Sequence, residues 1–379
     1  MAFVAGPRQV GKTTTCQRIG TGYLNWDNAD HRRVIVAGPE ATAERVGLQR
    51  LHAKAPILVF DELHKYGRWK GFLKGFFDTY GERAKILVTG SSRLDVYRRG
   101  GDSLLGRYFL FRMHPFTVGE IARVRPPAKN PIQAPVRIPE KEFGALWTHG
   151  GYPEPLLRQE EAFTLRWRSS RNRLLLREDI RDLTQIRELG QIELLGTLLG
   201  ERSGASLVYS NLAKDLQTSV DTVRRWVGSF CALHYGFLVR PWFQNVARAL
   251  RKEPKWFLRD WSGIQDPGAR AETFVACHLL KSVEGWEDLG IGEFELRYVR
   301  DREKREVDFL IVRNRKPWCL VEVKSTETSL NPWLAYFQKS TGAPHAFQAV
   351  FDLEYEDVDC FSRHDPAVVP MRTLLSQLL

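Results

Sequence analysis

The N-terminal third of the chain contains three short, largely apolar runs that end in glycine or polar residues. They are AFVA at 2–5, ILVF at 57–60 and KILVT at 85–89. Runs of this kind are typical of parallel strands that are buried on both faces of a sheet. The pattern therefore predicts an α/β fold, and it places polar residues at the carboxyl ends of the strands, where such sheets bind ligands.

A different pattern covers the middle of the chain. Residues 211–216 form a short amphipathic segment, 217–219 a turn, and 220–231 a second helical segment with Ser219 as its expected N-cap. An apolar run over 236–240 follows and is expected to be a strand. This order predicts a helix-turn-helix with a trailing, wing-like strand.

The last third combines one long helix with several strands. Apolar residues recur at every fourth position over 271–283, which predicts a helix with one buried face. Three strand-like runs follow at 295–299, 306–312 and 318–324. The two-residue period of the second strand predicts one buried face, made of Val307, Phe309 and Ile311.

Composition excludes several classes of protein. Of 379 residues, 43% are hydrophobic and 27% are charged, which excludes a wholly disordered chain. No run approaches the about 18 apolar residues of a membrane helix, so we expect no membrane partner. Five scattered cysteines without a CxxC pair predict a reduced, cytoplasmic protein. The net charge of +11 favours a polyanionic partner, and DNA is the partner that we expect.

The strongest motif follows the first strand and matches G-x-x-x-x-G-K-[ST] at every position. Its expected nucleotide-binding residues are Gly6, Pro7, Arg8, Gln9, Val10, Gly11, Lys12, Thr13 and Thr14. Glycines let the backbone N–H groups face phosphate oxygens, and the next helix directs the positive end of its dipole at the same place. Lys12 is expected to neutralise the β- and γ-phosphates, and the Thr13 hydroxyl to bind Mg²⁺.

Polar residues after the next two apolar runs complete this predicted site. Asp61 is placed to hold Mg²⁺, and Glu62 to orient or deprotonate the attacking water. A hydroxyl after the 85–89 run, for which we choose Ser91, is expected to contact the γ-phosphate or that water. The sequence thus predicts ATP binding and Mg²⁺-dependent hydrolysis, although it does not distinguish adenine from guanine.

The order of loop, Asp-Glu strand and polar-tipped strand resembles the AAA-type P-loop ATPases. More narrowly, the chain resembles a group of prokaryotic AAA ATPases that carry a C-terminal domain of unknown function. The segments that carry this resemblance are GPRQVGKTT, YLNWDN, ILVFDELHK, ILVTGSS, LLGRYFLFRMHPFTVGE and GGYPEP. Members of the group usually have a few dozen residues before the first strand, so either the adenine pocket is built differently here or the natural start lies upstream of Met1.

The resemblance also implies an arginine finger, supplied in cis or by a neighbouring subunit of a homo-oligomer. Arg93, Arg99 and Arg107 are the candidates, and we choose Arg107. The alternative for each is that it only lines a basic surface.

In the helix-turn-helix, the start of the second helix is the part that would enter a DNA groove. Thr222, Arg224 and Arg225 are expected to be exposed there, while Val223 and Trp226 pack inward. The alternative is a winged-helix fold that serves as a spacer between domains.

Four residues of the last third resemble the restriction-endonuclease-like PD-(D/E)xK fold. They are Glu272 on the helix, Asp308 on the second strand, and Glu322 with Lys324 on the third. The carboxylates are suited to hold Mg²⁺ or Mn²⁺, and Lys324 to position a water molecule. The alternative is an inert remnant in which Glu322 and Lys324 form an ion pair.

These patterns predict four parts: an AAA-type ATPase domain at 1–155, a helical connector at 156–205, a winged-helix-like module at 206–249 and a nuclease-like domain at 250–379. We expect an ATPase that acts on DNA through the winged helix and a metal-dependent nuclease-like domain. Two alternatives remain: an ATP-driven switch that binds DNA or protein with an inert nuclease fold, and a transcriptional regulator that reads DNA with the winged helix.

Overall fold

The structure is a computed structural model whose chain divides into two compact units, Met1–His114 and Pro115–Leu379. The residues that it describes are 1–90, 104–123, 129–176, 180, 189–243 and 253–379. The first unit thus ends earlier than the boundary expected near residue 155. The reason is that Val118, Phe143 and Leu146 belong to the hydrophobic core of the second unit.

The first unit contains a parallel five-stranded sheet in the order β2-β3-β4-β1-β5. Its strands are β1 (Ala2–Ala5), β2 (Gly22–Asn25), β3 (Ile57–Asp61), β4 (Lys85–Thr89) and β5 (Phe109–Arg112). Its helices are α1 (Lys12–Ile19), α2 (Ala29–Ala37), α3 (Pro39–Arg45) and α4 (Trp69–Tyr80), with a 3₁₀ turn η1 (Leu63–Lys65). The three apolar runs of the sequence are β1, β3 and β4, as expected.

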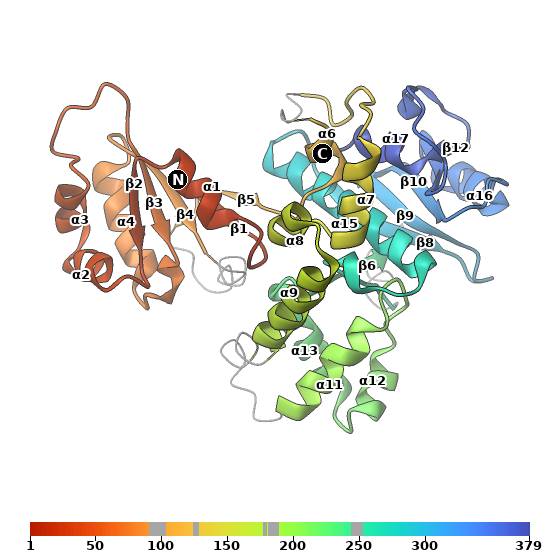
Figure 1. Ribbon diagram of the computed structural model, residues 1–379, viewed down its shortest axis with the longest axis horizontal. Helices are drawn as coiled ribbons and strands as arrows, with labels where there is room; N and C mark the ends of the chain where they lie inside the picture. The colour runs from red at the N-terminus through yellow and green to blue at the C-terminus, as the bar shows by residue number, and fades with distance from the viewer. Residues whose placement is uncertain (91–103, 124–128, 177–179, 181–188, 244–252) are drawn as a thin grey trace. The chain divides into compact units, whose positions relative to one another are not determined.

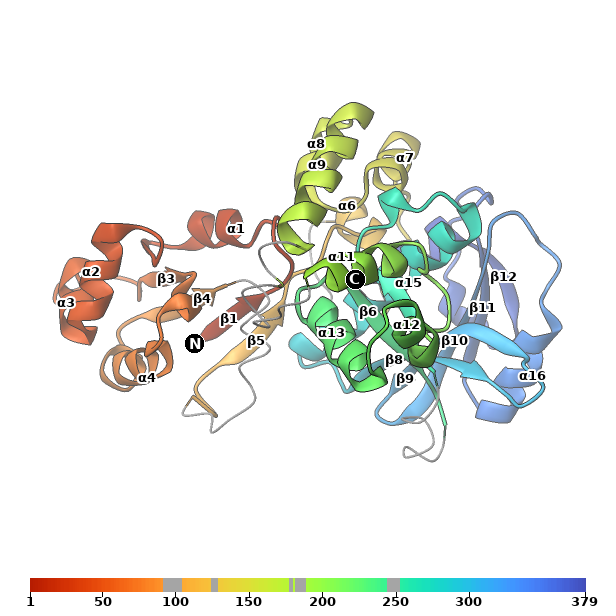
Figure 2. The ribbon, with the colours of Figure 1, turned by 90° about the horizontal axis from the view of Figure 1, so that it is seen from below.

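Helices cover both faces of this sheet, since α1 and α4 lie on opposite sides of it (Figure 2). Phe60 of β3 and Phe76 of α4 are fully buried, with ring centres 5.5 Å apart. Because the strands are parallel, the ends of β3 and β4 meet at one edge, where Asp61 is the register partner of Thr89. The loop that follows β1 begins at the same edge.

The second unit contains a seven-stranded mixed sheet in the order β12-β11-β10-β9-β8-β6-β7 (Figure 1). Its strands are β6 (Gly236–Pro241), β7 (Lys255–Leu258), β8 (Phe294–Arg300), β9 (Glu306–Arg313), β10 (Lys316–Lys324), β11 (His345–Val350) and β12 (Ala367–Pro370). The long helix α15 (Pro267–Asp288) contacts β8, β9 and β10, and α16 (Pro332–Thr341) contacts β9, β10 and β11. The two helices contribute to different hydrophobic clusters.

Shorter helices complete the second unit. They are α6 (Val118–Ala122), α7 (Glu140–His149), α8 (Pro153–Arg158), α9 (Glu161–Leu174), α11 (Leu189–Gly200), α12 (Tyr209–Asp215), α13 (Val220–Ala232) and α17 (Met371–Ser376). Helices α12 and α13 are the two helices expected from the middle of the sequence. The hydroxyl of Ser219 accepts a hydrogen bond from the backbone N–H of Thr222 and caps α13. Val223 and Trp226 are buried, which confirms the expected packing face.

The face assignment of β9 is wrong in one respect. Phe309 and Ile311 lie in the cluster beside α15, but Val307 packs with Leu310 and Val312 in the cluster beside α16. The cause is a register shift between β8 and β9, where one residue of β8, Tyr298, lies opposite two residues of β9, Asp308 and Phe309. An extra residue in one strand reverses the side-chain alternation, which a two-residue period in the sequence does not reveal.

Candidate functional site

The loop after β1 has the backbone that phosphate binding requires. Gly6 and Gly11 have φ values of 149° and 97°, in a region that favours glycine. A Cβ at Gly6 would lie 2.2 Å from the carbonyl oxygen of Met113, so no larger residue fits there without a shift. Of the other residues expected to contact the nucleotide, Arg8, Gln9, Thr13 and Thr14 are exposed, whereas Pro7 and Val10 are buried.

Lys12 is buried inside this loop and folds back onto it. Its side-chain Nζ donates hydrogen bonds to the carbonyl oxygens of Gly6 at 2.9 Å and Pro7 at 2.6 Å. Burial lowers the pKa of Lys12 to about 8, and the carboxylates of Glu62 and Asp61 offset only part of that effect. A buried ammonium group surrounded by a curled backbone is suited to an anionic ligand.

Asp61 connects the loop to the ends of the neighbouring strands. Its Oδ2 accepts hydrogen bonds from the Thr13 hydroxyl at 3.0 Å and from the Tyr23 hydroxyl at 2.7 Å, and its Oδ1 accepts one from the Thr89 hydroxyl. The sequence assigned Mg²⁺ to both Thr13 and Asp61, and the structure places these two side chains in contact. These oxygen ligands are of the kind that Mg²⁺ prefers, so the residues fit that ion.

Two residues of this site were missed. The hydroxyls of Tyr23 and Thr89 both donate to the carboxylate of Asp61, but neither residue belongs to a sequence motif. Thr89 lies two residues before Ser91, the residue that we chose. Burial and the bond to Asp61 raise the pKa of Tyr23, so its hydroxyl stays a hydrogen-bond donor. The available signal was the position of Thr89 at the end of a predicted strand.

Glu62 follows Asp61 in a left-handed backbone conformation, with φ of 55°. Its N–H donates to the carbonyl oxygen of Thr89 at 3.1 Å, which joins it to the end of β4. Its Oε2 lies 3.2 Å from Nζ of Lys65 and 3.8 Å from Nε2 of His64. The carboxylate is thus oriented by neighbours on the turn η1.

Arg107 lies at the opposite edge of the sheet from the loop. Its carbonyl oxygen accepts a hydrogen bond from the Met1 amine at 2.9 Å, beside the start of β1, whereas the loop leaves the end of β1. Its Nε lies 2.8 Å from Oδ1 of Asp78. Since a four-residue strand spans about 13 Å, Arg107 does not reach the loop of its own chain. Ser91, Arg93 and Arg99 lie outside the described residues.

The second cluster of charged residues lies in the second unit, around Asp308 of β9. Lys255 of β7 places its Nζ 3.2 Å from Oδ1 of Asp308 and 2.6 Å from Oε1 of Glu306. Oδ2 of Asp308 accepts a hydrogen bond from the N–H of Val323 at 3.0 Å. Sequence reasoning missed Lys255 and Glu306, since Lys255 lies 53 residues from Asp308 and belongs to no motif.

The carboxylate of Glu322 also forms an ion pair and a hydrogen bond with neighbouring side chains. Its Oε1 lies 2.9 Å from Nζ of Lys324 and accepts a hydrogen bond from Asn331 at 2.8 Å. Burial raises the pKa of Glu322, against the effect of Lys324. Burial, together with the charge of Asp308, raises the pKa of Glu272 to about 8.

The three carboxylates expected to hold a metal ion, Glu272, Asp308 and Glu322, lie in one cluster with Lys255. Within the described part of the chain, no group of three or more His, Cys, Asp or Glu side chains is arranged to hold a metal ion. Lys255 and Lys324 each lie close to one oxygen, Oδ1 of Asp308 and Oε1 of Glu322. Oε2 of Glu322 is buried without a hydrogen-bond partner. Carboxylate oxygens of this kind are ligands that Mg²⁺ and Mn²⁺ accept.

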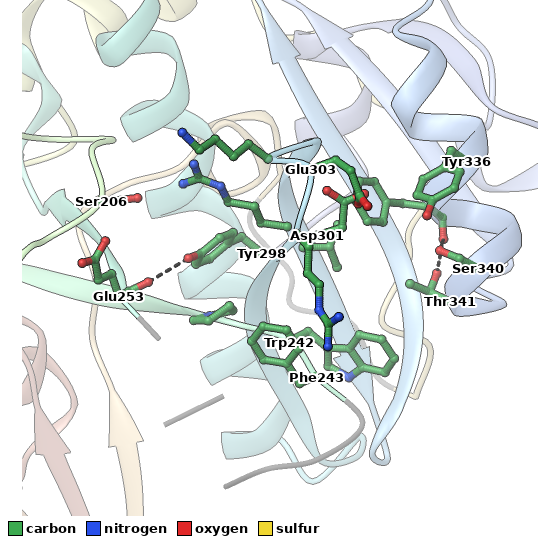
Figure 3. Close-up of a pocket in the computed structure, with 16 residues that line it drawn as sticks. Ser206, Trp242, Phe243, Glu253, Tyr298, Asp301, Glu303, Tyr336, Ser340 and Thr341 are labelled. Atoms are coloured by element: carbon green, nitrogen blue, oxygen red, sulfur yellow. Dashed lines mark hydrogen bonds between the residues drawn. The ribbon is translucent and has the colours of Figure 1, made fainter. Parts of the chain in front are cut away.

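A cavity of about 980 Å³ lies beside this cluster. Trp242, Tyr298 and Tyr336 contribute aromatic walls, and the Tyr298 hydroxyl donates to the carbonyl oxygen of Glu253 at 2.7 Å (Figure 3). Nζ of Lys255 lies 5.6 Å from the centre of the Tyr298 ring. The cluster is therefore next to the wall of the cavity.

The expected DNA-contacting residues lie at the start of α13. Arg224 and Arg225 are exposed, and Thr222 is half-buried. Nη1 of Arg224 lies 3.7 Å from Oδ1 of Asp221, and its guanidinium lies 5.4 Å from the ring centre of Tyr209. Arg225 points away from the buried face formed by Val223 and Trp226.

Three family models match successive parts of the chain. Residues 1–122 match the AAA domain family. Residues 140–264 and 267–371 match families described as domains of unknown function, DUF8612 and DUF4143. The first match, together with the loop geometry, supports an AAA-type P-loop ATPase domain in the first unit.

The chain is also similar to whole proteins. Uncharacterised proteins of Mycobacterium bovis and Mycobacterium tuberculosis are each 23% identical over 347 residues, covering 86% of this chain and 71% of theirs. The Orc1 protein of Aeropyrum pernix in complex with DNA is 15% identical with a TM-score of 0.31, covering 73% of this chain and 86% of that one. None of the described helices has the length and apolar character needed to cross a membrane.

Proposed function

We propose that the first unit hydrolyses ATP with the help of Mg²⁺. The observation that carries this proposal is the 3.0 Å contact between the Thr13 hydroxyl and Asp61. It brings together the two side chains that would hold Mg²⁺ beside a loop suited to phosphates. When bound, Mg²⁺ would neutralise charge on the phosphates.

The other residues of the loop supply binding and orientation. Lys12 would exchange its bonds to Gly6 and Pro7 for phosphate oxygens, which are stronger acceptors. Glu62 would orient the attacking water and accept its proton, while Lys65 keeps the carboxylate in position. Tyr23 and Thr89 would hold Asp61 in place.

The substitution Glu62→Gln tests this assignment. We expect hydrolysis to fall by about 10²-fold or more, because the amide cannot accept a proton, while ATP affinity stays within about twofold. The measurements are phosphate release and titration with a fluorescent ATP analogue. Glu40→Gln on α3 is the matched control, since Glu40 is exposed. An E62Q protein that hydrolyses ATP at the unsubstituted rate would refute the role of Glu62.

We infer further that the protein is cytoplasmic and acts on DNA, with the region from α11 to β7 as a winged-helix module. Support comes from the helix order α11, α12 and α13, the antiparallel pair of β6 and β7, and the isolated bridge between Ser206 and Lys255. The net charge of +11 and the exposed Arg225 agree with a polyanionic partner. Because Arg107 lies at the edge of the sheet opposite its own loop, we propose that it serves the loop of a neighbouring subunit in a homo-oligomer.

Removing both arginines of α13 tests the DNA contact. We expect R224A/R225A to bind duplex DNA at least about tenfold more weakly at fixed salt, since each contact is worth about 1 kcal/mol or more. Fluorescence anisotropy with a labelled duplex measures this. Arg202→Ala, which removes an arginine after α11, should leave affinity nearly unchanged. Equal loss on all DNA sequences would refute the regulator alternative, and unchanged affinity would refute DNA contact by α13.

For the last third we propose a restriction-endonuclease-like fold. Support comes from the order α15, β8, β9, β10, α16, β11, in which β8, β9 and β10 are antiparallel neighbours and β11 is parallel to β10. Glu272, Asp308, Glu322 and Lys324 stand on α15, β9 and β10, as the resemblance requires. We propose that this domain is a metal-dependent nuclease-like domain that acts on DNA, and the alternative is an ATP-driven switch with a non-cleaving domain.

A further inference from the structure

The cavity beside the charged cluster of the second unit has walls that are rich in aromatic side chains. Five of the 16 residues that line it are aromatic: Trp242, Phe243, Tyr298, Tyr336 and Phe337. They come from the end of β6, from β8 and from α16, and Figure 3 shows the first four around the same hollow. A volume of about 980 Å³ is large enough for a nucleotide, since pockets for ligands of that size measure about 300–1,000 Å³.

Two of these rings are open to solvent. Tyr336 is 42% exposed, although the guanidinium of Arg305 lies 4.3 Å from its ring centre. Trp242 is half-buried and packs in part against the hydrophobic cluster beside α16. Exposed aromatic rings are the surfaces on which unpaired nucleobases stack, and an arginine beside the ring adds to such a platform.

The turn between β8 and β9 brings positive charge to the rim of the cavity. Its two acids, Asp301 and Glu303, both form ion pairs with Arg305. Arg302 and Lys304 also line the cavity and are exposed, and no ion pair joins either of them to another described residue. Because the acids are already paired, these two cations are available to the phosphates of a nucleic acid.

The cavity shares a wall with the charged cluster around Asp308. Arg300 lines the cavity, and its Nε lies 3.6 Å from Oε2 of Glu306. Nζ of Lys255 contacts Oε1 of Glu306 at 2.6 Å and Oδ1 of Asp308 at 3.2 Å. A strand of nucleic acid in the cavity would therefore lie next to the carboxylates of the nuclease-like domain.

We propose that this cavity binds a single-stranded segment of DNA, whose bases stack on Trp242 and Tyr336 and whose phosphates contact Arg302 and Lys304. Bases inside a duplex are paired and stacked on one another, so only unpaired bases can lie against these rings. The one other acid of the lining, Glu253, comes from the segment before β7 and not from the turn. This inference rests on the proposed action on DNA and names the form of DNA that reaches the nuclease-like cluster, but it requires neither ATP hydrolysis nor cleavage.

Fluorescence anisotropy with a labelled oligo(dT) and with a labelled duplex of the same length tests the proposal. The full-length protein is used without nucleotide, at fixed salt and in EDTA, so that no cleavage occurs. R302Q/K304Q removes the charges of the rim, Tyr336→Leu removes the ring, and Tyr336→Phe keeps it.

Each change has a matched control on the second unit. R315Q/K316Q removes an exposed arginine and an exposed lysine from the turn between β9 and β10. Arg315 also has the left-handed backbone of Lys304, with φ values of 64° and 65°. Tyr355→Leu removes a half-buried tyrosine that does not line this cavity.

We expect R302Q/K304Q and Y336L to bind oligo(dT) at least about tenfold more weakly than the unsubstituted protein, because phosphate contacts and base stacking are lost. Oligo(dT) affinity should stay within about twofold in Y336F and both controls, and duplex affinity within about threefold in all variants. Unchanged oligo(dT) affinity in either cavity variant, or a duplex affinity that falls as much as the oligo(dT) affinity, would overturn the proposal. Tighter binding of oligo(U) than of oligo(dT) would overturn DNA as the ligand.

Cleavage is followed in a separate reaction with Mn²⁺ in place of EDTA. A protein that binds oligo(dT) through the cavity but cleaves no DNA would refute the nuclease activity and still support this site. A protein that binds the duplex but not oligo(dT) would overturn the site and leave the contact by α13 in place.

Discussion

Lys12 shows how a contiguous motif can be read reliably from a sequence. All the residues that cradle its ammonium group lie within six positions of it, so the spacing alone specifies the loop. Asp61 was also predictable, since it ends an apolar strand at the edge where the loop begins. Tyr23 was not, because its contact with Asp61 depends on the order of strands in the sheet, whereas for Thr89 the signal was its position at the end of a predicted strand.

The pKa of Lys12 gives a prediction at the same scale. Because burial lowers this pKa to about 8 in the empty site, the ammonium form is lost as pH rises above that value. A phosphate ligand prefers the charged form, so ATP affinity should fall about tenfold or more between pH 7.5 and 9.5. Titration with a fluorescent ATP analogue across this range measures the effect.

Lys12→Arg is the control for that measurement. The guanidinium of arginine stays charged throughout the range, so the variant should show no such fall, whatever its affinity at pH 7.5. If the ATP affinity of the unsubstituted protein stays constant over this pH range, Lys12 does not lose its charge within that range.

At the scale of elements, the helices and strands themselves were largely predictable, and their side-chain contacts were not. The expected strand of residues 306–312 corresponds to β9 (Glu306–Arg313), but a bulge reverses the face of Val307. The long helix α15 (22 residues) is nine residues longer than the segment 271–283 read from its apolar period, and at its start Asp266 caps it and Pro267 begins it. Neither residue takes part in that period. Lys255 was missed because its partners lie on another strand, β9.

The contact between α15 and α6 has a predictable pH dependence. His278 of α15 donates from Nδ1 to the carbonyl oxygen of Phe274 and accepts the N–H of Val118 at Nε2, over 2.7 and 3.0 Å. Burial lowers the pKa of His278 to about 3, from an ordinary value near 6.5. The unfolded chain thus binds a proton below pH 6.5 that the folded chain does not, and the stability of this region falls with falling pH.

We expect the opening free energy of α15 to drop by about 1 kcal/mol between pH 7 and 5.5 through His278 alone. Hydrogen exchange of the α15 amides, corrected for intrinsic rates, measures it in the intact protein. The glutamine of His278→Gln cannot take up this proton, so the opening free energy of α15 in this variant should fall by about 1 kcal/mol less over the same pH range. The same drop in both proteins would show that His278 is not the group responsible.

At the scale of the whole molecule, the two units have different kinds of charge arrangement. In the first unit, Lys12 and the Thr13–Asp61 pair form a site that an anion and Mg²⁺ would complete. In the second, Lys255 and Lys324 face the carboxylates of Glu306, Asp308 and Glu322. We therefore propose nucleotide hydrolysis for the first unit and DNA contact for the second.

The most direct test of this account is ATP hydrolysis by the full-length chain, measured as phosphate release over a range of Mg²⁺ concentrations. The K12A and D61N variants are measured beside the unsubstituted protein. We predict that the unsubstituted protein requires Mg²⁺, that D61N needs a Mg²⁺ concentration about tenfold higher or more, and that K12A is inactive. Hydrolysis by K12A at the unsubstituted rate, or hydrolysis that persists without Mg²⁺, would contradict the central claim.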